Sequence, residues 1–434
     1  MKNKVYLILF IMFLGFVLVA CSTNDNEEQK PHGKNGTDSD EMNIEETNIE
    51  TKTEKIKYDL EKIDSNVVDV NQKFAFDIFK KLNEEDSQES VFISPFSISQ
   101  ALTMTYNGAK GTTKEGMEKA LGYIEIDSIV VNESYKNLNN FLASIDDKIT
   151  LNIGNSLWIR EGEDVKGEFI SRNEDTFNAE VISIDFSDMT AADSINNWIR
   201  KATNGKIDKM IIPPISDEIL MYLINAIYFK GEWSEQFDPD LTYKGDFTRI
   251  DGTIQRVNMM MRSSGSYEYI GNEGYKAVRL PYGNGKTSMY IILPAEGKDI
   301  NEFINEMTTS KWSGIKKTVS DTKDIVFGLP RFRLDYGSKE LNESLIALGM
   351  EEAFDSNADF SGIREDIYIG SVMHKAFVEV NEEGTEAAAV TVVTTDTAMA
   401  EPLTFVLNRP FMFIINDEVM DTILFMGKVV SIEE

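Results

Sequence analysis

The side chains that most often supply nucleophiles, general bases and metal ligands are scarce in this sequence. Its 434 residues include one cysteine, Cys21, and two histidines, His32 and His374. No H-E-x-x-H, C-x-x-C or G-x-S-x-G motif occurs. Nucleophilic catalysis needs a nucleophile with a base beside it, and no such set can be assembled here. We therefore expect a protein that is not an enzyme and that holds no metal ion or cofactor.

Neither a nucleotide nor a nucleic acid is expected as a ligand. Gly285-Lys286-Thr287 imitates the end of a phosphate-binding loop, but Leu280 occupies the position of the required first glycine. Strand-like residues flank the segment from Tyr282 to Lys286, which we interpret as a hairpin turn. The formal net charge of -30 argues against nucleic acid, since phosphates require Lys and Arg for neutralisation.

The residues before Cys21 indicate a different chemistry for this cysteine. Lys2 and Lys4 precede an apolar run from Val5 to Val19, which is the pattern of a secretory signal. The run ends in Leu18-Val19-Ala20-Cys21, which resembles a bacterial lipobox. We expect residues 1–20 to be a lipoprotein signal peptide and Cys21 to carry the lipid. An ordinary signal peptide with an incidental cysteine is the alternative.

The residues that follow Cys21 are predicted to form a tether. From Ser22 to about Lys62 the sequence is rich in polar and acidic residues and has almost no large apolar ones. Such a segment cannot bury enough surface to offset the entropy lost on ordering. We expect 21–62 to be the lipidated cysteine and a disordered acidic tether, and 63–434 to be one domain. The protein would then be extracellular, anchored to the outer face of a bacterial membrane.

An unusual pattern lies between Glu382 and Ala400. Every second residue from Thr385 to Thr395 is uncharged, and the positions between them carry charge only at Glu386. Asp396 follows directly after this run. Because alternate residues of a strand share a face, the segment has one wholly uncharged face. A flexible loop or a short helix is the plain alternative. We favour a segment that can enter a sheet as a strand where the sheet has an unfilled position.

Several stretches resemble the serpin family. Glu382-Glu383-Gly384-Thr385-Glu386-Ala387-Ala388-Ala389 looks like the serpin hinge, and the run from Asn408 to Val429 resembles the closing signature of the family. Four other matching pieces keep the family order: Phe92–Ser99, Asn225–Trp233, Leu329–Phe332 and Asp359–Ile363. The resemblance covers about 67–434, and the chain is identified as a member of the serpins, of a bacterial lipoprotein type.

The resemblance implies an α+β fold with a large central β-sheet, smaller sheets, about eight or nine helices and an exposed reactive-centre loop. In serpins a peptidase attacks this loop and forms its acyl-enzyme. The cut loop then enters the central sheet as a new strand, and the peptidase is carried along and distorted. The implied function is irreversible inhibition of a serine peptidase. The peptidase would be the covalent partner, and the inhibitor would be a monomer.

The resemblance also locates the bond that the peptidase would cut. Counting by the family's spacing from Gly384 gives Ala398–Met399, whereas counting back from Pro410 gives Met399–Ala400. We favour Ala398 as the bait residue, because the hinge-side length must match the inserted strand. Either bait is a small or unbranched apolar side chain. This suits elastase-like or subtilisin-like peptidases, whereas trypsin-like enzymes require Arg or Lys.

Supporting residues are assigned in the same way. Trp233 matches a tryptophan near the loop's point of entry, and Glu382 and Arg331 fall where the family often pairs opposite charges. We therefore predict a salt bridge between Glu382 and Arg331. The polar cluster beneath the opening point of the sheet is matched by Ser94, Ser97, Asn225 and His374.

Two rival functions share this fold. A non-inhibitory serpin would act as a binding or carrier protein, and bulky or charged residues on the inward face of its hinge would favour it. That face is uncharged here. An inhibitor of a cysteine peptidase would use the same loop mechanism.

The elements that must position these residues follow from hydrophobic spacing. Phe74, Ile78 and Leu82 keep helical spacing, and Ser94-Pro95 offers an N-cap with proline at the first helical position. Helices mostly precede the strands, which favours an α+β fold. Strands are predicted at Leu151–Ile159, Leu220–Phe229, Ala277–Leu280, Met289–Leu293, Ala376–Val380, Phe405–Leu407, Phe411–Ile415 and Ile423–Met426.

Overall fold

Helices dominate the first part of the folded body. The computed structural model describes residues 57–385 and 402–433. α1 (Ser65–Glu85) buries the predicted stripe of Phe74, Ile78 and Leu82. α2 (Pro95–Tyr106) begins at proline, and the side chain of its N-cap, Ser94, accepts a hydrogen bond from the backbone N–H of Ser97. Both helices therefore begin or pack as predicted.

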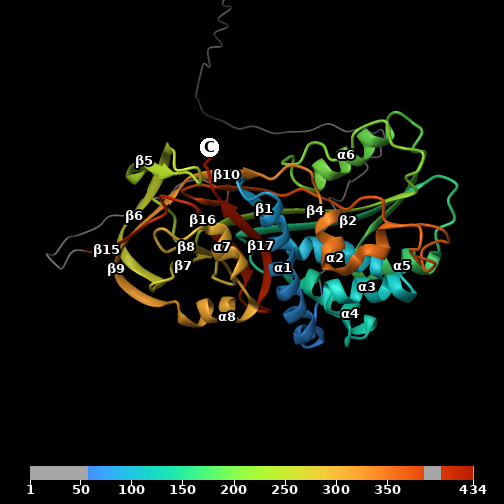
Figure 1. Cartoon of the computed structure of the whole chain (residues 1–434), viewed down its shortest axis with the longest axis horizontal. Helices are drawn as coiled ribbons and strands as arrows, with labels where there is room; N and C mark the ends of the chain where they lie inside the picture. Colours follow the sequence, from blue (N-terminus) through green and yellow to red (C-terminus); the bar gives the residue numbers. More distant parts are fainter. Residues whose placement is uncertain (1–56, 386–401, 434) are drawn as a thin grey trace, which may run out of the picture. The chain divides into compact units, whose positions relative to one another are not determined.

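The other α-helices of the described part are shorter than α1, and most of them flank the sheets (Figure 1). They are α3 (Gly111–Leu121), α4 (Ser128–Leu142), α5 (Gly167–Phe177), α6 (Ala191–Ala202), α7 (Ile300–Asn305), α8 (Thr309–Thr318) and α9 (Asn342–Leu345). Short helical turns lie at Leu60–Lys62, Pro239–Leu241, Ile346–Met350 and Glu351–Phe354.

The largest hydrogen-bonded sheet has nine strands in the order β1-β17-β16-β8-β7-β6-β9-β15, with β5 paired to β6. β8, β16 and β17 are buried along their whole length, which explains the apolar runs Met289–Leu293, Phe411–Ile415 and Ile423–Met426 within them. The strands are β1 (Val91–Ile93), β5 (Tyr243–Thr248), β6 (Ile254–Gly271), β7 (Tyr275–Tyr282), β8 (Thr287–Pro294), β9 (Ser320–Pro330), β15 (Leu403–Val406), β16 (Phe411–Asp417) and β17 (Thr422–Val429).

The remaining strands form a group that is divided into separate pieces. A four-stranded piece has the order β14-β4-β2-β3, and a two-stranded piece pairs β10 with β13. A second short pair joins β11 to β12. The strands are β2 (Ile149–Arg160), β3 (Glu180–Ile184), β4 (Met221–Glu232), β10 (Phe332–Asp335), β11 (Lys339–Glu340), β12 (Met373–His374), β13 (Phe377–Val380) and β14 (Gly384–Thr385).

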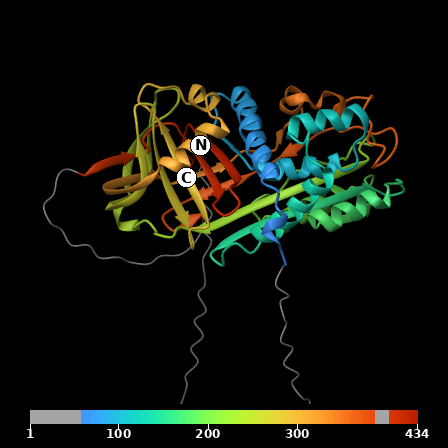
Figure 2. The same ribbon diagram turned by 90° about the horizontal axis from the view of Figure 1, so that it is seen from below.

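The two faces of β2 and β4 are covered by different helices. Figure 1 shows α6 on one side of these strands and α2 on the other. Figure 2 shows β4, in yellow-green, running lengthwise beside β2, with which it pairs antiparallel. Under α6 lies a small apolar core that includes Trp158, Ile199 and Ile224. The α2 side faces the main core, to which Ile227 and Phe229 belong.

The predicted α+β fold, its strands and the Tyr282–Lys286 turn are confirmed, but the predicted end of the tether is too late. The ring of Tyr58 lies edge-on to Phe141 of α4, with 5.4 Å between centroids. The backbone N–H of Asp59 donates to Asn137 Oδ1 at 2.8 Å, and Leu60 packs against the main core. Residues 57–62 therefore belong to the body, because the Tyr58 ring contacts α4 and the partly buried Leu60 packs against the core.

None of the helices in 57–385 and 402–433 combines the length and the apolar composition that crossing a membrane would require.

Candidate functional site

The hinge segment is bound by its backbone to the end of β4. Gly384 lies opposite Glu232 and Thr385 opposite Gly231 in an antiparallel pair. The backbone N–H of Trp233 donates to the carbonyl oxygen of Glu383 at 3.0 Å. Gly384 has a φ of 148°, and a Cβ there would collide with the backbone oxygen of Gly231. This position therefore requires glycine, as the hinge pattern contains.

Trp233 lies beside the residues that lead into the hinge. Its ring is buried and stacks on Tyr282, with 4.4 Å between centroids. Its indole Nε1–H donates to the carbonyl oxygen of Asn381 at 3.0 Å. The tryptophan therefore fixes the residues that immediately precede the hinge.

The predicted salt bridge is present. Arg331 Nη2 lies 2.6 Å from Glu382 Oε1, and the Thr242 hydroxyl donates to the same oxygen at 2.7 Å. Burial alone would raise the pKa of Glu382, but the hydrogen bonds from Arg331 and Thr242 outweigh it and hold the pKa below its usual value. The carboxylate side chain is 6% exposed, so its charge depends on these partners. The pair fastens the residue at which the hinge begins.

A slot separates the two strands that flank the hinge. β13 pairs with β10, whereas β4 pairs with β2 and, at its end, with β14. Across the described residues, no strand pairing joins β4 to β13. Within the described residues, β14 pairs with the end of β4 on the slot side, at Gly231 and Glu232. The described part of the chain thus contains the first residues of a further strand beside β4.

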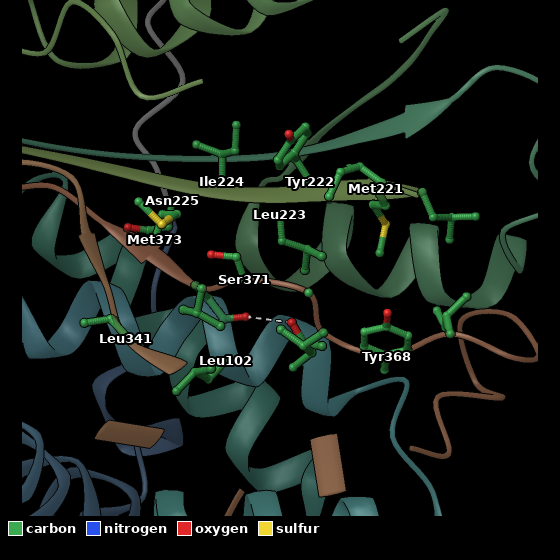
Figure 3. Close-up of a pocket in the computed structure, with 18 of the residues that line it drawn as sticks. Leu102, Met221, Tyr222, Leu223, Ile224, Asn225, Leu341, Tyr368, Ser371 and Met373 are labelled. Atoms are coloured by element: carbon green, nitrogen blue, oxygen red, sulfur yellow. Dashed lines mark hydrogen bonds between the residues drawn. The ribbon is translucent and has the colours of Figure 1, made fainter. Parts of the chain in front are cut away.

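The far end of the slot opens into a cavity of about 320 Å³. Figure 3 shows residues of β4, including Met221 and Leu223, along one side of it. Ser371 and Met373 lie on the opposite side, and Leu102 of α2 lies beneath. The cavity is bounded by β4 on one side and by residues 366–374, which precede β13 along the chain, on the other.

The four residues of the predicted polar cluster meet at the first turn of α2. Ser94 donates its backbone N–H to His374 Nε2 at 3.1 Å, on the β13 side of the slot. Ser97 donates its hydroxyl to Asn225 Oδ1, on the β4 side. The Ser97 backbone N–H donates to Ser94 Oγ at 3.2 Å, which joins the two halves. One helix end thus holds both sides of the slot.

Two members of this cluster were not predicted. Asn225 donates its amide to Asn155 Oδ1 at 2.7 Å and to Gln100 Oε1 at 3.1 Å. Asn155 lies directly opposite Asn225 in the β2–β4 register, and Gln100 lies three residues after Ser97 on α2. An asparagine within the apolar run Leu151–Ile159 was the available signal for Asn155, but its partner depends on the register.

His374 is held in its neutral form. Its side chain is buried, and this burial lowers its pKa from 6.5 to about 4. The neutral ring accepts the hydrogen bond from Ser94 at Nε2. At neutral pH the neutral ring of His374 therefore helps to hold the polar cluster together through its hydrogen bond with Ser94.

The remaining predicted residues lie outside the described part of the chain. They are Cys21, Glu386, Ala387, Ala388, Ala389, Ala398, Met399 and Ala400. Within the described ranges, no group of three or more His, Cys, Asp or Glu side chains is arranged to hold a metal ion.

Comparisons with known proteins identify a family model and relatives that match this chain. The family model described as "Serpin (serine protease inhibitor)" matches residues 69–432. An uncharacterised serpin-like protein of Methanosarcina acetivorans is 33% identical over 433 residues, covering 96% of this chain and 97% of that protein. The leukocyte elastase inhibitor of Bos taurus is 34% identical, covering 83% of this chain and 98% of that protein.

Solved structures give the same result. Tengpin, a thermophilic serpin crystallised in its native state, matches with a TM-score of 0.76 and 34% identity over 85% of this chain and 95% of that chain. Human thyroxine-binding globulin, crystallised in complex with thyroxine, matches with a TM-score of 0.77 and 28% identity over 85% of this chain and 99% of that chain.

Proposed function

This chain belongs to the serpin family, and from that premise we propose that it irreversibly inhibits a serine peptidase of the elastase-like or subtilisin-like class. Serpins are protease inhibitors and not catalysts, and relatives of this chain include inhibitors named for leukocyte elastase. The observation that carries the proposal is the start of a strand, β14, in a slot between β4 and β13.

The register of β14 defines how the rest of the loop would fill the slot. Because Thr385 lies opposite Gly231 in an antiparallel pair, each later residue would meet the preceding residue of β4. Thr395 would then lie opposite Met221, the first residue of the strand. Residues 385–395, whose odd-numbered members are all uncharged, would thus lie alongside β4 from Gly231 to its first residue.

The same register decides which face of the loop would be buried. Residues directly opposite each other in a sheet point to the same face, so the uncharged positions would share the face of Phe229 and Ile227. These two side chains belong to the main core. Glu386 and Asp396 would share the opposite face with Ile224, which lies under α6. The uncharged face is thus the one that insertion would bury.

The chemical step that precedes insertion belongs to the peptidase. Its serine oxygen adds to the carbonyl carbon of the bait residue, which we assign to Ala398. The bond to the nitrogen of Met399 breaks, and Met399 departs as a new amino terminus that carries the proton. The ester between peptidase and Ala398 remains. Insertion of residues 385–395 would then carry this ester to the far end of the slot before water hydrolyses it.

Mixing the protein with a panel of peptidases tests this function. With an elastase-like or subtilisin-like enzyme we expect a covalent complex that survives SDS, and mass spectrometry of the released peptide to show Met399 as its first residue. A peptide that begins at Ala400 would move the bait to Met399.

Other outcomes of the same panel favour the rival functions. Cleavage of the loop without a complex by every enzyme would favour a non-inhibitory carrier, the role that the name of human thyroxine-binding globulin gives to that protein. A complex formed only with a cysteine peptidase in the panel would reassign the target class.

Membrane anchoring is a separate part of the proposal. Cys21 follows an apolar run that ends in Leu18-Val19-Ala20, and lipidation there would tether the folded body to the outer face of a membrane. Cys21→Ser should therefore move the protein from the membrane fraction to the soluble fraction, while trapping of a peptidase is unchanged. Continued membrane association of this variant would contradict the lipid anchor.

A further inference from the structure

The loop after α6 is anchored on one side of the slot. Ile207 and Ile211 are buried in the small core with Ile224 of β4. The side-chain oxygen of Asn196, on α6, accepts hydrogen bonds from the backbone N–H groups of Met210 and Ile211, both at 2.9 Å. These contacts therefore fix the loop to the half of the sheet that contains β2 and β4.

One residue of this loop contacts the other half. Lys206 Nζ lies 3.8 Å from Glu379 Oε2 and 5.2 Å from the centroid of the Phe377 ring, and both partners are on β13. Arg333 of β10 lies over the same ring at 5.1 Å and faces Glu379 in the register. The β13 side of this contact is therefore fixed within the two-stranded piece.

The contact lies on the α6 face of the sheet. Val378 and Val380 are buried in the main core, so the alternate residues Phe377 and Glu379 point to the opposite face. The small core that anchors Ile207 lies under α6 on that same face. Lys206 thus spans the slot above the sheet, whereas the polar cluster at α2 joins its two sides from below.

We propose that Lys206, Glu379 and Phe377 form a clasp that holds the two halves of the sheet at a set separation and limits the rate at which the slot admits a strand. The proposal rests on the proposed function and adds a residue that regulates it. Strand side chains that point to the α6 face would have to displace Lys206 as they pass. Faster release of the clasp would speed insertion of the loop. It would therefore favour trapping of the peptidase, because insertion competes with hydrolysis of the acyl-enzyme.

The strength of the clasp is limited by its exposure. The Lys206 and Glu379 side chains are 26% and 38% exposed, and such pairs are weak and screened by salt. We therefore expect a rate effect of about two- to fivefold at low ionic strength, and a smaller one at about 1 M salt.

The test uses the full chain with Lys206→Met, Glu379→Gln and the double substitution. Methionine keeps an apolar stem against Phe377 and removes only the charge. Lys62→Met is the matched control. Lys62 forms a half-exposed ion pair with Glu133 of α4, with 2.5 Å between Lys62 Nζ and Glu133 Oε1. Two readouts are needed: amide hydrogen exchange of the 221–232 peptide in the uncut protein, and the rate of stabilisation after the loop is nicked.

We expect each single substitution to accelerate both readouts by about two- to fivefold, the double substitution to add nothing further, and Lys62→Met to have no effect. Unchanged or slower exchange in Lys206→Met and Glu379→Gln would overturn the clasp. Faster exchange with no stabilisation after nicking would leave the clasp in place and reject the proposed function. Unchanged exchange with normal stabilisation would reject the clasp alone.

Discussion

Replacing Thr385 by arginine is expected to convert the protein from an inhibitor into a substrate. Thr385 lies opposite Gly231, and a Cβ on Gly231 would lie 2.9 Å from the Tyr282 ring and 3.0 Å from the Phe229 ring. The register therefore places position 385 directly opposite a strand position that is closely packed by aromatic rings. Burying an unpaired charge there costs about 3 kcal/mol or more, which corresponds to about a 100-fold slower insertion.

The stoichiometry of inhibition measures this effect, because slow insertion lets water release the peptidase. For Thr385→Arg we expect the moles of inhibitor consumed per mole of trapped enzyme to rise about tenfold or more. Glu386→Arg is the matched control, since position 386 would share the other face of the strand and should retain trapping. If both variants trapped as well as the parent protein, or if only the control failed, the insertion register would be wrong.

Acidification is expected to destabilise the native form through His374. The pKa of this residue is about 4 in the folded protein, against 6.5 when unfolded. Above pH 6.5 both states are neutral and His374 makes no pH-dependent contribution. As the pH falls from 6.5 to 4 the unfolded state takes up the proton first, and the native form loses about 3 kcal/mol. Below pH 4 both states are protonated and the loss levels off.

Comparison with His374→Gln isolates this contribution from that of other groups. Glutamine does not titrate, and its side-chain oxygen can accept the hydrogen bond from the backbone N–H of Ser94. The midpoint of urea unfolding should fall more steeply between pH 6.5 and 4 in the parent protein than in the variant. Parallel pH profiles would show that His374 is not buried in its neutral form. The comparison matters because Asp417, whose pKa burial raises to about 6, changes stability in the opposite direction.

The sequence predicted the components of the site better than their connections. Hydrophobic spacing located α1, β2 and β4, and charge alternation located the uncharged face that begins at Thr385. The salt bridge of Glu382 with Arg331 and the four-residue polar cluster came from the family resemblance. Each of these depends on residue type at a given position, which a sequence records directly.

The contacts that sequence reasoning missed depend on which strands are neighbours. Asn155 meets Asn225 only because β2 pairs with β4 in one register. Lys206 meets Glu379 because a loop anchored beside β4 reaches across to β13. The two residues are 173 positions apart in the sequence. Neither pairing leaves a local pattern in the sequence. The slot itself is likewise a property of strand order: among the described residues β13 pairs with β10, and β4 pairs with β2 along its length but with β14 at Gly231 and Glu232 alone.

The melting temperature of the protein after a single cut in its loop tests the central claim most directly. A peptidase that nicks the loop without being trapped would free residues 385–395 to continue the strand that β14 begins. We expect the nicked protein to melt at a higher temperature than the intact one and to show slower amide exchange in β4. A nicked protein that melts at the same or a lower temperature, with β4 exchanging as before, would contradict this account.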